Sequence, residues 1–197
     1  MTLIKREFVF IDGENLLFRF QALLAGGKMP KKEVTHVPDV FVWSDSAINK
    51  WIGDIMRASY YTSYVGSHEK KVEIEEKILG CTYKFEAPQM VADGRLIPSV
   101  FKKEKKQEKS RSVDINISID SLWHGFRNDY DLCILFSGDG DFIPLVDAIQ
   151  RLGKQVHIHA FSSGLNHGLR RKADAFHLLD DCFFEKNTQQ SSAGNVG

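Results

Sequence analysis

The 197-residue chain is long enough for one domain with a sizeable core, and its 43% apolar content is typical of a globular protein. Its formal net charge of zero excludes binding of nucleic acid through bulk positive charge, so any such surface must be local. The three cysteines are widely spaced, which argues against a disulfide framework and a CxxC zinc site. The charged N-terminus argues against a signal peptide, and the lack of a long apolar run argues against a membrane span. These features together predict a cytoplasmic protein.

The first predicted strand ends on an acidic turn. Residues 8–11 form a short apolar run that ends on Asp12. Gly13, Glu14 and Asn15 then lead into a helix with apolar residues at helical spacing, which Gly26 and Gly27 terminate. Asn15 can cap this helix, form the turn, or hold a substrate or an aspartate in place, and the sequence leaves these alternatives open.

The region from residue 28 to residue 85 carries further elements but no candidate site. Residues 40–43 are interpreted as a strand or a packed loop, and residues 44–51 as a short helix. The aromatic and β-branched stretch 57–65 predicts a strand; its tyrosines could stack on bases, but aromatic residues of a half-buried strand usually belong to the core, which is the interpretation we favour. Residues 67–79 predict a helix with a charged, solvated face, and residues 82–85 another strand.

A basic segment precedes the next predicted helix. It carries six basic residues against two acidic ones: Lys102, Lys103, Lys105, Lys106, Lys109 and Arg111. A solvated loop and an arm that follows the phosphates of a nucleic acid are both compatible with this composition. The position of the segment directly before Asp114 favours the phosphate-binding interpretation.

Residues 112–126 are ambiguous in period. Alternation of apolar residues reads as a strand, whereas a stripe of Ile115, Ile119, Leu122 and Phe126 reads as a helix. About fifteen residues is long for a strand, so we predict a helix with Asp114 in its first turn.

The central motif follows an unbroken apolar strand at residues 132–136. Ser137-Gly138-Asp139-Gly140-Asp141-Phe142 then leads into a helix that ends at Gly153. Asp139 and Asp141 therefore lie at the carboxyl end of a buried strand, where ligands bind in open α/β sheets. Asp141 can alternatively cap the helix. A dinucleotide-binding loop is rejected, because Ile143 stands where that motif requires glycine.

The remainder of the chain predicts two short strands, at 155–161 and 176–179, on either side of a basic turn or short helix at 165–173. His157 and His159 lack an evident third metal ligand and are interpreted as core or solvent-facing residues. Residues 1–185 are expected to form a single domain, and the polar tail 186–197 is expected to be disordered.

Four aspartates stand at element boundaries: Asp12, Asp114, Asp139 and Asp141. Alternating strands and helices predict a mostly parallel sheet, whose carboxyl edge would gather Asp12 with Asp139 and Asp141. Clustered carboxylates repel one another unless a cation binds, and ligands that are all oxygen favour Mg²⁺ or Mn²⁺. A bound metal of this kind can activate water and neutralise a phosphodiester.

The blocks around Asp12-Gly13-Glu14-Asn15, Val113-Asp114, Ser137-Gly138-Asp139-Gly140-Asp141 and Ala173-Asp174 resemble, in order and spacing, the NYN domain family of the PIN-like nuclease superfamily. The resemblance covers residues 8–179. It implies a Rossmann-like three-layer α/β/α sandwich and a metal-dependent ribonuclease. It also implies acidic ligands at Asp12, Asp114, Asp139 and Asp141, with Asn15 and Ser137 in support and Asp120 and Asp174 at further family positions.

Two other classes of function compete with this interpretation. An RNA-binding or partner-recruiting module with a vestigial site would keep the fold without the cleavage. A Mg²⁺-dependent phosphohydrolase of the haloacid dehalogenase type would need a second aspartate where this chain has Glu14. We expect single-stranded RNA as the partner; the sequence leaves open which RNA is bound and whether the chain forms a homodimer or binds another protein.

Overall fold

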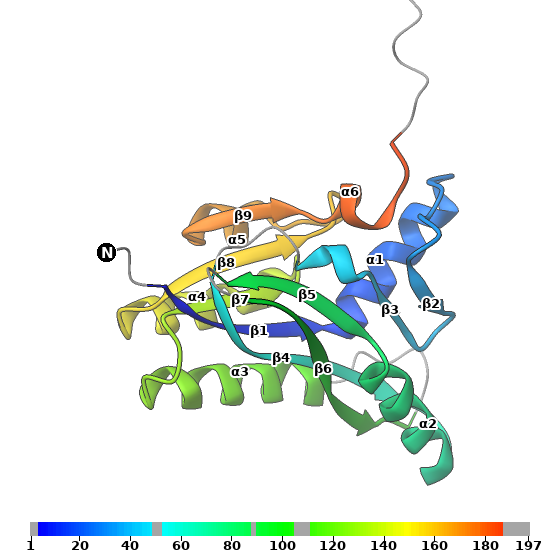
Figure 1. Ribbon diagram of the computed structural model, residues 1–197, viewed down its shortest axis with the longest axis horizontal. Helices are drawn as coiled ribbons and strands as arrows, with labels where there is room; N and C mark the ends of the chain where they lie inside the picture. The colour runs from blue at the N-terminus through cyan, green and yellow to red at the C-terminus, as the bar shows by residue number, and fades with distance from the viewer. Residues whose placement is uncertain (1–3, 49–52, 88–89, 105–110, 187–197) are drawn as a thin grey trace, which may run out of the picture.

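A seven-stranded sheet runs through the protein in a computed structural model that describes residues 4–48, 53–87, 90–104 and 111–186 (Figure 1). The strand order across the sheet is β5-β6-β4-β1-β7-β8-β9. In chain order its strands are β1 (Arg6–Asp12), β4 (Asp54–Tyr64), β5 (Thr82–Ala87), β6 (Met90–Lys102), β7 (Leu132–Phe136), β8 (Gln155–Ala160) and β9 (Ala175–Leu178). A separate antiparallel pair joins β2 (Thr35–Val37) to β3 (Phe41–Trp43).

The central strand β1 pairs in parallel with β4 on one side and with β7 on the other. Every residue of β1 after Arg6 is buried, which is why this strand reads as an apolar run between neighbours on both sides. Within the described strands of the seven-stranded sheet, only the β5–β6 pairing is antiparallel, so six adjacent strands point the same way. The carboxyl ends of β1 and β7 therefore lie side by side at one edge of the sheet.

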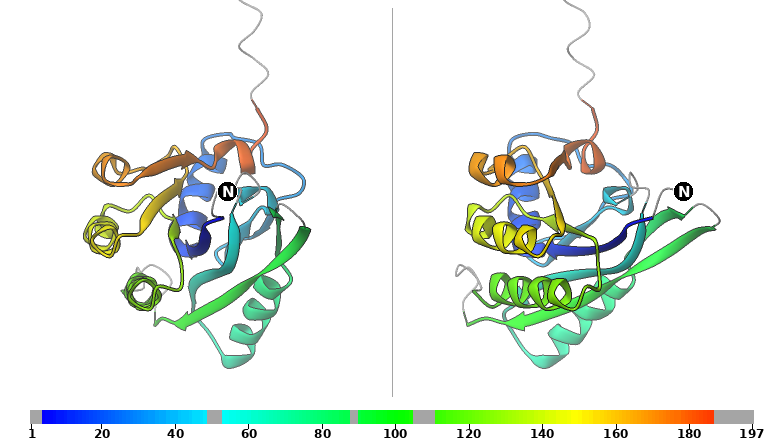
Figure 2. Two further views of the ribbon diagram at one scale, coloured as in Figure 1. Left: turned by 60° about the vertical axis from the view of Figure 1, so that its left-hand side comes forward. Right: turned by 90° about the vertical axis from the view of Figure 1, so that its left-hand side faces the viewer.

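Helices cover both faces of the sheet (Figure 2). One apolar cluster joins Val9 and Ile11 of β1 to α1 and α2, and the other joins Phe8 and Phe10 of the same strand to α3, α4 and α5. Alternate side chains of β1 thus point into two different cores, as a three-layer α/β/α sandwich requires. The helices are α1 (Gly13–Ala25), α2 (His68–Leu79), α3 (Arg111–Phe126), α4 (Ile143–Arg151), α5 (His167–Lys172) and α6 (Asp180–Phe183), with short 3₁₀ turns η1 (Asp45–Ala47) and η2 (Gly140–Phe142).

The predicted architecture is confirmed, including the helix over residues 112–126 that the sequence left ambiguous between helix and strand. The sequence analysis assigned no element to residues 86–101, where the structure has most of β6. Gly94 and Pro98 make this strand difficult to predict from the sequence, because both residue types are depleted in strands. Gly94 is needed because a side chain there would clash with the ring of Tyr83 on the paired strand.

Several predictions concern residues on which the structure gives only part of the answer. The helix predicted over 44–51 begins as η1, whereas residues 49–52 lie outside the described part of the chain. The tail beyond Lys186 also lies outside it, so its predicted disorder stays a prediction. None of the helices in the described segments combines the length and apolar character that a membrane span needs.

Candidate active site

Asp12 ends β1 and caps the N-terminus of α1. Its side chain is only 1% exposed, and both of its carboxylate oxygens accept hydrogen bonds. The backbone N–H of Asn15 donates to Oδ1 at 3.0 Å, and the hydroxyl of Ser137 donates to Oδ2 at 3.0 Å. Gly13 follows because β4 passes so close that a Cβ there would lie 2.3 Å from the ring of Tyr60. The carboxylate is therefore fixed on two sides at the carboxyl edge of the sheet.

The turn after β7 contains the second pair of aspartates. Ser137 is buried, and its hydroxyl oxygen accepts from the backbone N–H of Asp139 at 3.2 Å. Asp139 in turn caps η2, because its Oδ1 accepts from the N–H of Asp141 at 3.0 Å. Asp139 is half-buried and Asp141 is exposed. Asp139 thus caps η2, whereas the N-cap position of the following helix α4 is Phe142.

Two side chains link the β1–α1 turn to the β7–α4 turn. Ser137 donates to Asp12 while it accepts from Asp139, so its single hydroxyl touches both candidate residues. Asn15 accepts the N–H of Gly138 through its amide oxygen at 3.2 Å. Asn15 therefore does not cap α1, a role that Asp12 fills, but ties the two turns together. The structure brings Asp12, Asn15, Ser137 and Asp139 into one hydrogen-bonded group.

Helix α3 brings Asp114 to the same edge from a different direction. β6 runs parallel to β4 and ends at Lys102, so the chain reaches the carboxyl edge before α3 begins at Arg111. Asp114 lies in the first turn of α3, as predicted, and is half-buried. The role of Asp114 as a metal ligand stays a prediction.

Asp120 anchors α3 to the sheet. Its Oδ2 accepts from the hydroxyl of Tyr61 at 2.7 Å, and Tyr61 pairs in register with Asp12. Burial raises the pKa of the Tyr61 hydroxyl above its ordinary value, and the hydrogen bond to Asp120 raises it further, so Tyr61 stays protonated and donates. The hydrogen bond between Asp120 and Tyr61 therefore fixes the position of α3 against β1 and β4.

Asp174 lies away from this group, whereas His159 is in the core and pairs in register with Phe136, the residue before Ser137. Asp174 immediately precedes β9 and accepts from the N–H of Val156 at the start of β8, so it sits at the opposite, amino edge of the sheet. The ring of His159 is buried 4.7 Å from that of Phe136 and 4.9 Å from that of His177. Burial lowers the pKa of His159 well below its ordinary value, which keeps this imidazole neutral.

The predicted phosphate-binding segment is only partly described. Lys102 is exposed, whereas the Nζ of Lys103 lies 2.8 Å from Oε1 of Glu14, which also accepts from the hydroxyl of Ser63. This partly buried pair ties the end of β6 to the first turn of α1. Lys105, Lys106 and Lys109 lie outside the described residues, as does the side chain of Arg111.

A cavity that the sequence analysis missed opens beside Asp139. Its volume is about 410 Å³, and its lining includes Arg19, Gly138, Asp139, Asn166 and His167. The Nε of Arg19 is buried and has no hydrogen-bond partner among the described residues. The sequence did contain one indication of this cavity: Arg19 follows Asn15 by four residues, and this spacing places both side chains on one face of α1. The carboxylates thus lie next to a cavity that carries a fixed positive charge.

Comparison with known proteins agrees with this geometry. The model of the NYN domain matches residues 6–180, which is most of the chain. The chain belongs to the NYN family. A solved structure of a protein of unknown function from Vibrio parahaemolyticus RIMD 2210633 matches with a TM-score of 0.61 and 21% identity, over 94% of this chain and 100% of that one, and shows the shared fold. No curated protein matches the chain.

The family assignment confirms the resemblance and gives this NYN domain a nuclease-like fold of the PIN type. Within the described segments, no three side chains of histidine, cysteine, aspartate or glutamate converge to form a ready-made metal site. Mg²⁺ is nevertheless commonly bound by one or two carboxylates, with waters and substrate phosphate completing its shell. The Ser137 hydroxyl joins the Asp12 carboxylate to the backbone of Asp139, so these neighbouring turns carry carboxylate oxygens of the type that a hard divalent ion takes.

Proposed function

We propose that this NYN domain is a ribonuclease that hydrolyses phosphodiester bonds of single-stranded RNA with Mg²⁺ or Mn²⁺ as its cofactor. The observation that carries the proposal is the shared hydroxyl of Ser137, which contacts both Asp12 and the backbone of Asp139 at the ends of adjacent parallel strands. Packing alone does not require a buried carboxylate beside a second carboxylate at a ligand-binding edge.

Each of the four aspartates would approach the metal from a different element. Asp12 is buried and oriented by two donors, so it offers a carboxylate in one fixed direction. Asp139 and Asp141 reach the surface from the neighbouring turn, and Asp114 reaches the edge from α3. When bound, the metal would supply an activated water and neutralise the charge of the phosphodiester.

The chain's own residues would position the RNA. Arg19 places a guanidinium in the cavity beside Asp139, where it can form charge-assisted hydrogen bonds with a phosphate. Lys102 adds an exposed cation at the end of β6, and the basic residues that follow it would extend this surface. Lys103 is less available for RNA, because its ammonium pairs with Glu14. Arg19 and Lys102 would thus bind phosphates of the RNA strand near the aspartates.

The decisive experiment is cleavage of a labelled single-stranded RNA with Mg²⁺, with Mn²⁺ and with EDTA. We expect cleavage only with a metal, and products with 5′-phosphate and 3′-hydroxyl ends, because water would be the nucleophile. Asp139→Asn should slow cleavage at least about 100-fold, a loss of roughly 2.7 kcal/mol of transition-state stabilisation. The fold should survive, because the asparagine oxygen can still accept from the N–H of Asp141.

Asp147→Asn is the matched control. Asp147 lies on α4 and pairs with Arg151 and Lys172, away from the carboxyl edge, so its loss should leave cleavage unchanged. Products with 2′,3′-cyclic phosphate ends would contradict the water mechanism. RNA binding without cleavage in either metal would instead support the alternative of a vestigial nuclease site.

A further inference from the structure

Helix α3 exposes a continuous apolar stripe on the side that faces away from the sheet. Its members are Ile115, Ile119, Trp123 and Phe126, with exposed fractions of 53%, 56%, 61% and 72%. They recur at intervals of four, four and three residues, which places them on one helix face. Val113 and Ile117 occupy the opposite face and are fully buried against the sheet. A helix that is apolar on both faces is normally covered on both.

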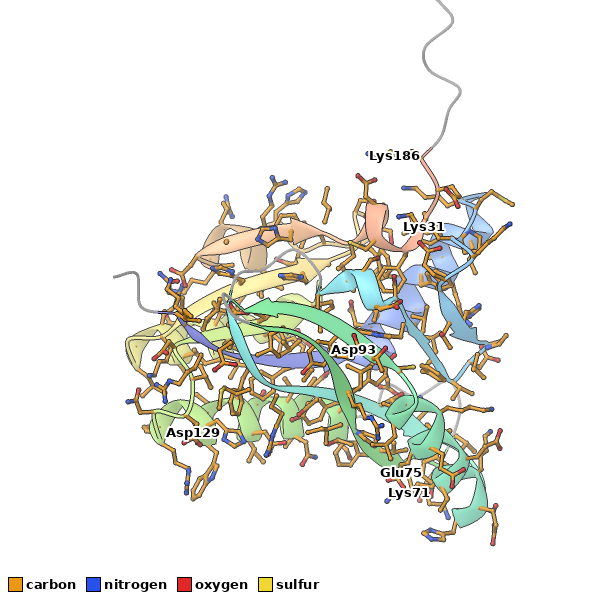
Figure 3. All side chains as sticks on the ribbon, viewed as in Figure 1. Lys31, Lys71, Glu75, Asp93, Asp129 and Lys186 are labelled. Atoms are coloured by element: carbon orange, nitrogen blue, oxygen red, sulfur yellow. The ribbon has the colours of Figure 1, made fainter. Side chains whose placement is uncertain are left out.

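Helix α2, on the other face of the sheet, shows what a solvated helix looks like in this protein. Seven of its twelve residues are charged, and ion pairs at i,i+4 spacing join Lys71 to Glu75 and Lys77 to Glu73 (Figure 3 labels the first pair). Between residues 112 and 126, α3 carries only two charged residues, Asp114 and Asp120, and no lysine or arginine. The outer face of α3 therefore lacks the charges that keep α2 in water.

We propose that the apolar stripe of α3 is a homodimer interface, in which α3 packs antiparallel against α3 of a second copy about a two-fold axis. The proposal concerns the outer face of α3 and does not depend on nuclease activity. A second copy is the partner that fits best, because the stripe is complementary to itself in this arrangement. An isologous contact uses the same patch on both subunits.

The spacing of the stripe fits such a pairing. An axis near the middle of the stripe sets Ile115 against Phe126 of the second copy and Ile119 against Trp123, so that each aliphatic side chain meets an aromatic one. Ile115, Ile119 and Trp123 form one i±4 ridge, which can pack into a groove beside the same ridge of the second copy. The antiparallel arrangement also sets the helix dipoles in opposition, which is favourable. It places the two Asp114 residues at opposite ends of the helix pair.

The size of the stripe is sufficient to anchor an interface. Exposed fractions of this size on two isoleucines and two aromatic residues correspond to on the order of 450 Å², within the range of about 300–600 Å² for the largest patch on a monomer. A standard interface takes about 800 Å² from each partner, with an apolar centre and a polar rim. Ser112 and Asn116 flank the stripe with uncharged polar groups that suit such a rim.

Two other occupants fit less well. A surface for RNA needs cations beside its aromatic rings, and residues 112–126 contain no lysine or arginine; Arg111 lies at the start of the helix, and Arg127, just past its end, pairs with Asp129. The eleven residues after Lys186 contain one large apolar side chain, Val196, so they offer too few anchors to cover four positions on α3. A second copy supplies four matching apolar side chains.

Sedimentation of the full chain between about 1 µM and 100 µM, a range that resolves micromolar association, tests the proposal. The wild type should shift with concentration from 22.4 kDa to the mass of two chains. Ile119→Asp and Trp123→Asp should each raise the dimer dissociation constant at least about 100-fold, because each buries a charge at the centre of the interface. Circular dichroism should show unchanged folding, since both side chains are exposed in the monomer.

Val72→Asp is the matched control, because Val72 is an exposed apolar residue on the charged helix α2. It should leave the dissociation constant unchanged. A wild type that remains at 22.4 kDa throughout, or a dimer that survives both α3 substitutions, would overturn the proposal. So would an α3 variant that loses RNA binding while its mass distribution stays that of the wild type, a result that would assign the stripe to RNA.

Discussion

The central strand β1 carries a buried carboxylate at each end, and the two ends differ in what surrounds it. At the carboxyl end, Asp12 accepts hydrogen bonds from the backbone of Asn15 and the hydroxyl of Ser137. At the amino end, Glu7 is 3% exposed, and its Oε2 has no hydrogen-bond partner among the described residues. Burial raises the pKa of Glu7 to about 7; the nearby charge of Lys5 opposes this rise in part, and the charge of Asp54 adds a smaller upward effect.

The difference shows that burial alone does not identify a functional carboxylate. A buried carboxyl group without donors responds by keeping its proton, as Glu7 does near neutral pH. Asp12 instead has two hydrogen-bond donors, and both come from the turns that form the candidate site. Donors converging on a carboxylate at the edge where ligands bind are therefore the more informative signal.

The largest expected effect comes from removing the charge at the carboxyl end. Asp12→Asn should reduce RNA cleavage at least about 100-fold, roughly 2.7 kcal/mol, because a metal ligand is lost. It should also lower the free energy of unfolding by about 1 kcal/mol, because an amide nitrogen cannot accept from the Ser137 hydroxyl. Cleavage rates and urea titrations measure the two effects. Near-normal activity in saturating Mg²⁺ would show that Asp12 is not a ligand.

The opposite result is expected at the amino end. Because the folded-state pKa of Glu7 is raised from 4.5 to about 7, the folded protein holds a proton that the unfolded chain releases, and stability falls as pH rises between these values. Glu7→Gln removes this penalty. It should raise the free energy of unfolding by about 1–2 kcal/mol at pH 8, with little change at pH 4.

Urea titrations of the wild type and Glu7→Gln at both pH values provide the measurement. RNA cleavage should be unaffected, since Glu7 lies at the far end of β1 from Asp12. An equal stability difference at the two pH values would mean that ionisation of Glu7 is not its source. Reduced cleavage would mean that the two ends of the strand are coupled.

Most of the fold could be predicted from local sequence, because its strands are apolar runs and its helices have regular apolar periods. β6 is the exception. Its first half pairs with β5 and its second half with β4, so it crosses between neighbours and contains Gly94 and Pro98. Gly94 is required by the ring of Tyr83 on β5, and Pro98 lies beyond Arg95, where β6 no longer pairs with β5 and forms an edge of the sheet. Local propensity therefore could not reveal the strand.

The candidate site was predicted in composition but not in connectivity. Strand ends that carry aspartate gave Asp12, Asp139 and Asp141, because parallel strands bring their carboxyl ends to one edge. The sequence could not show that one serine hydroxyl joins two of these turns, since that contact spans 125 residues. Nor could it distinguish the buried carboxylate of Asp12 from the more accessible Asp139, because burial depends on β4 packing against Gly13.

The smallest of these effects concerns the cations at the two edges of the sheet. Arg19 lines the cavity beside Asp139 at the carboxyl edge, whereas Arg151 ends α4 near the amino edge and forms an exposed pair with Asp147. If the cavity receives a phosphate of the bound strand, Arg19→Ala should raise the KM for RNA about tenfold, roughly 1.4 kcal/mol, with a smaller change in kcat. The slope of log affinity against log salt should fall by about 0.7, the value for one contact on a single strand. Arg151→Ala should leave both quantities unchanged, because an exposed ion pair far from the carboxylates has no contact with RNA in this scheme. Equal effects of the two substitutions would show that RNA affinity depends on the overall charge of the protein. The two edges of the sheet would then differ in the function of their carboxylates but not in that of their cations.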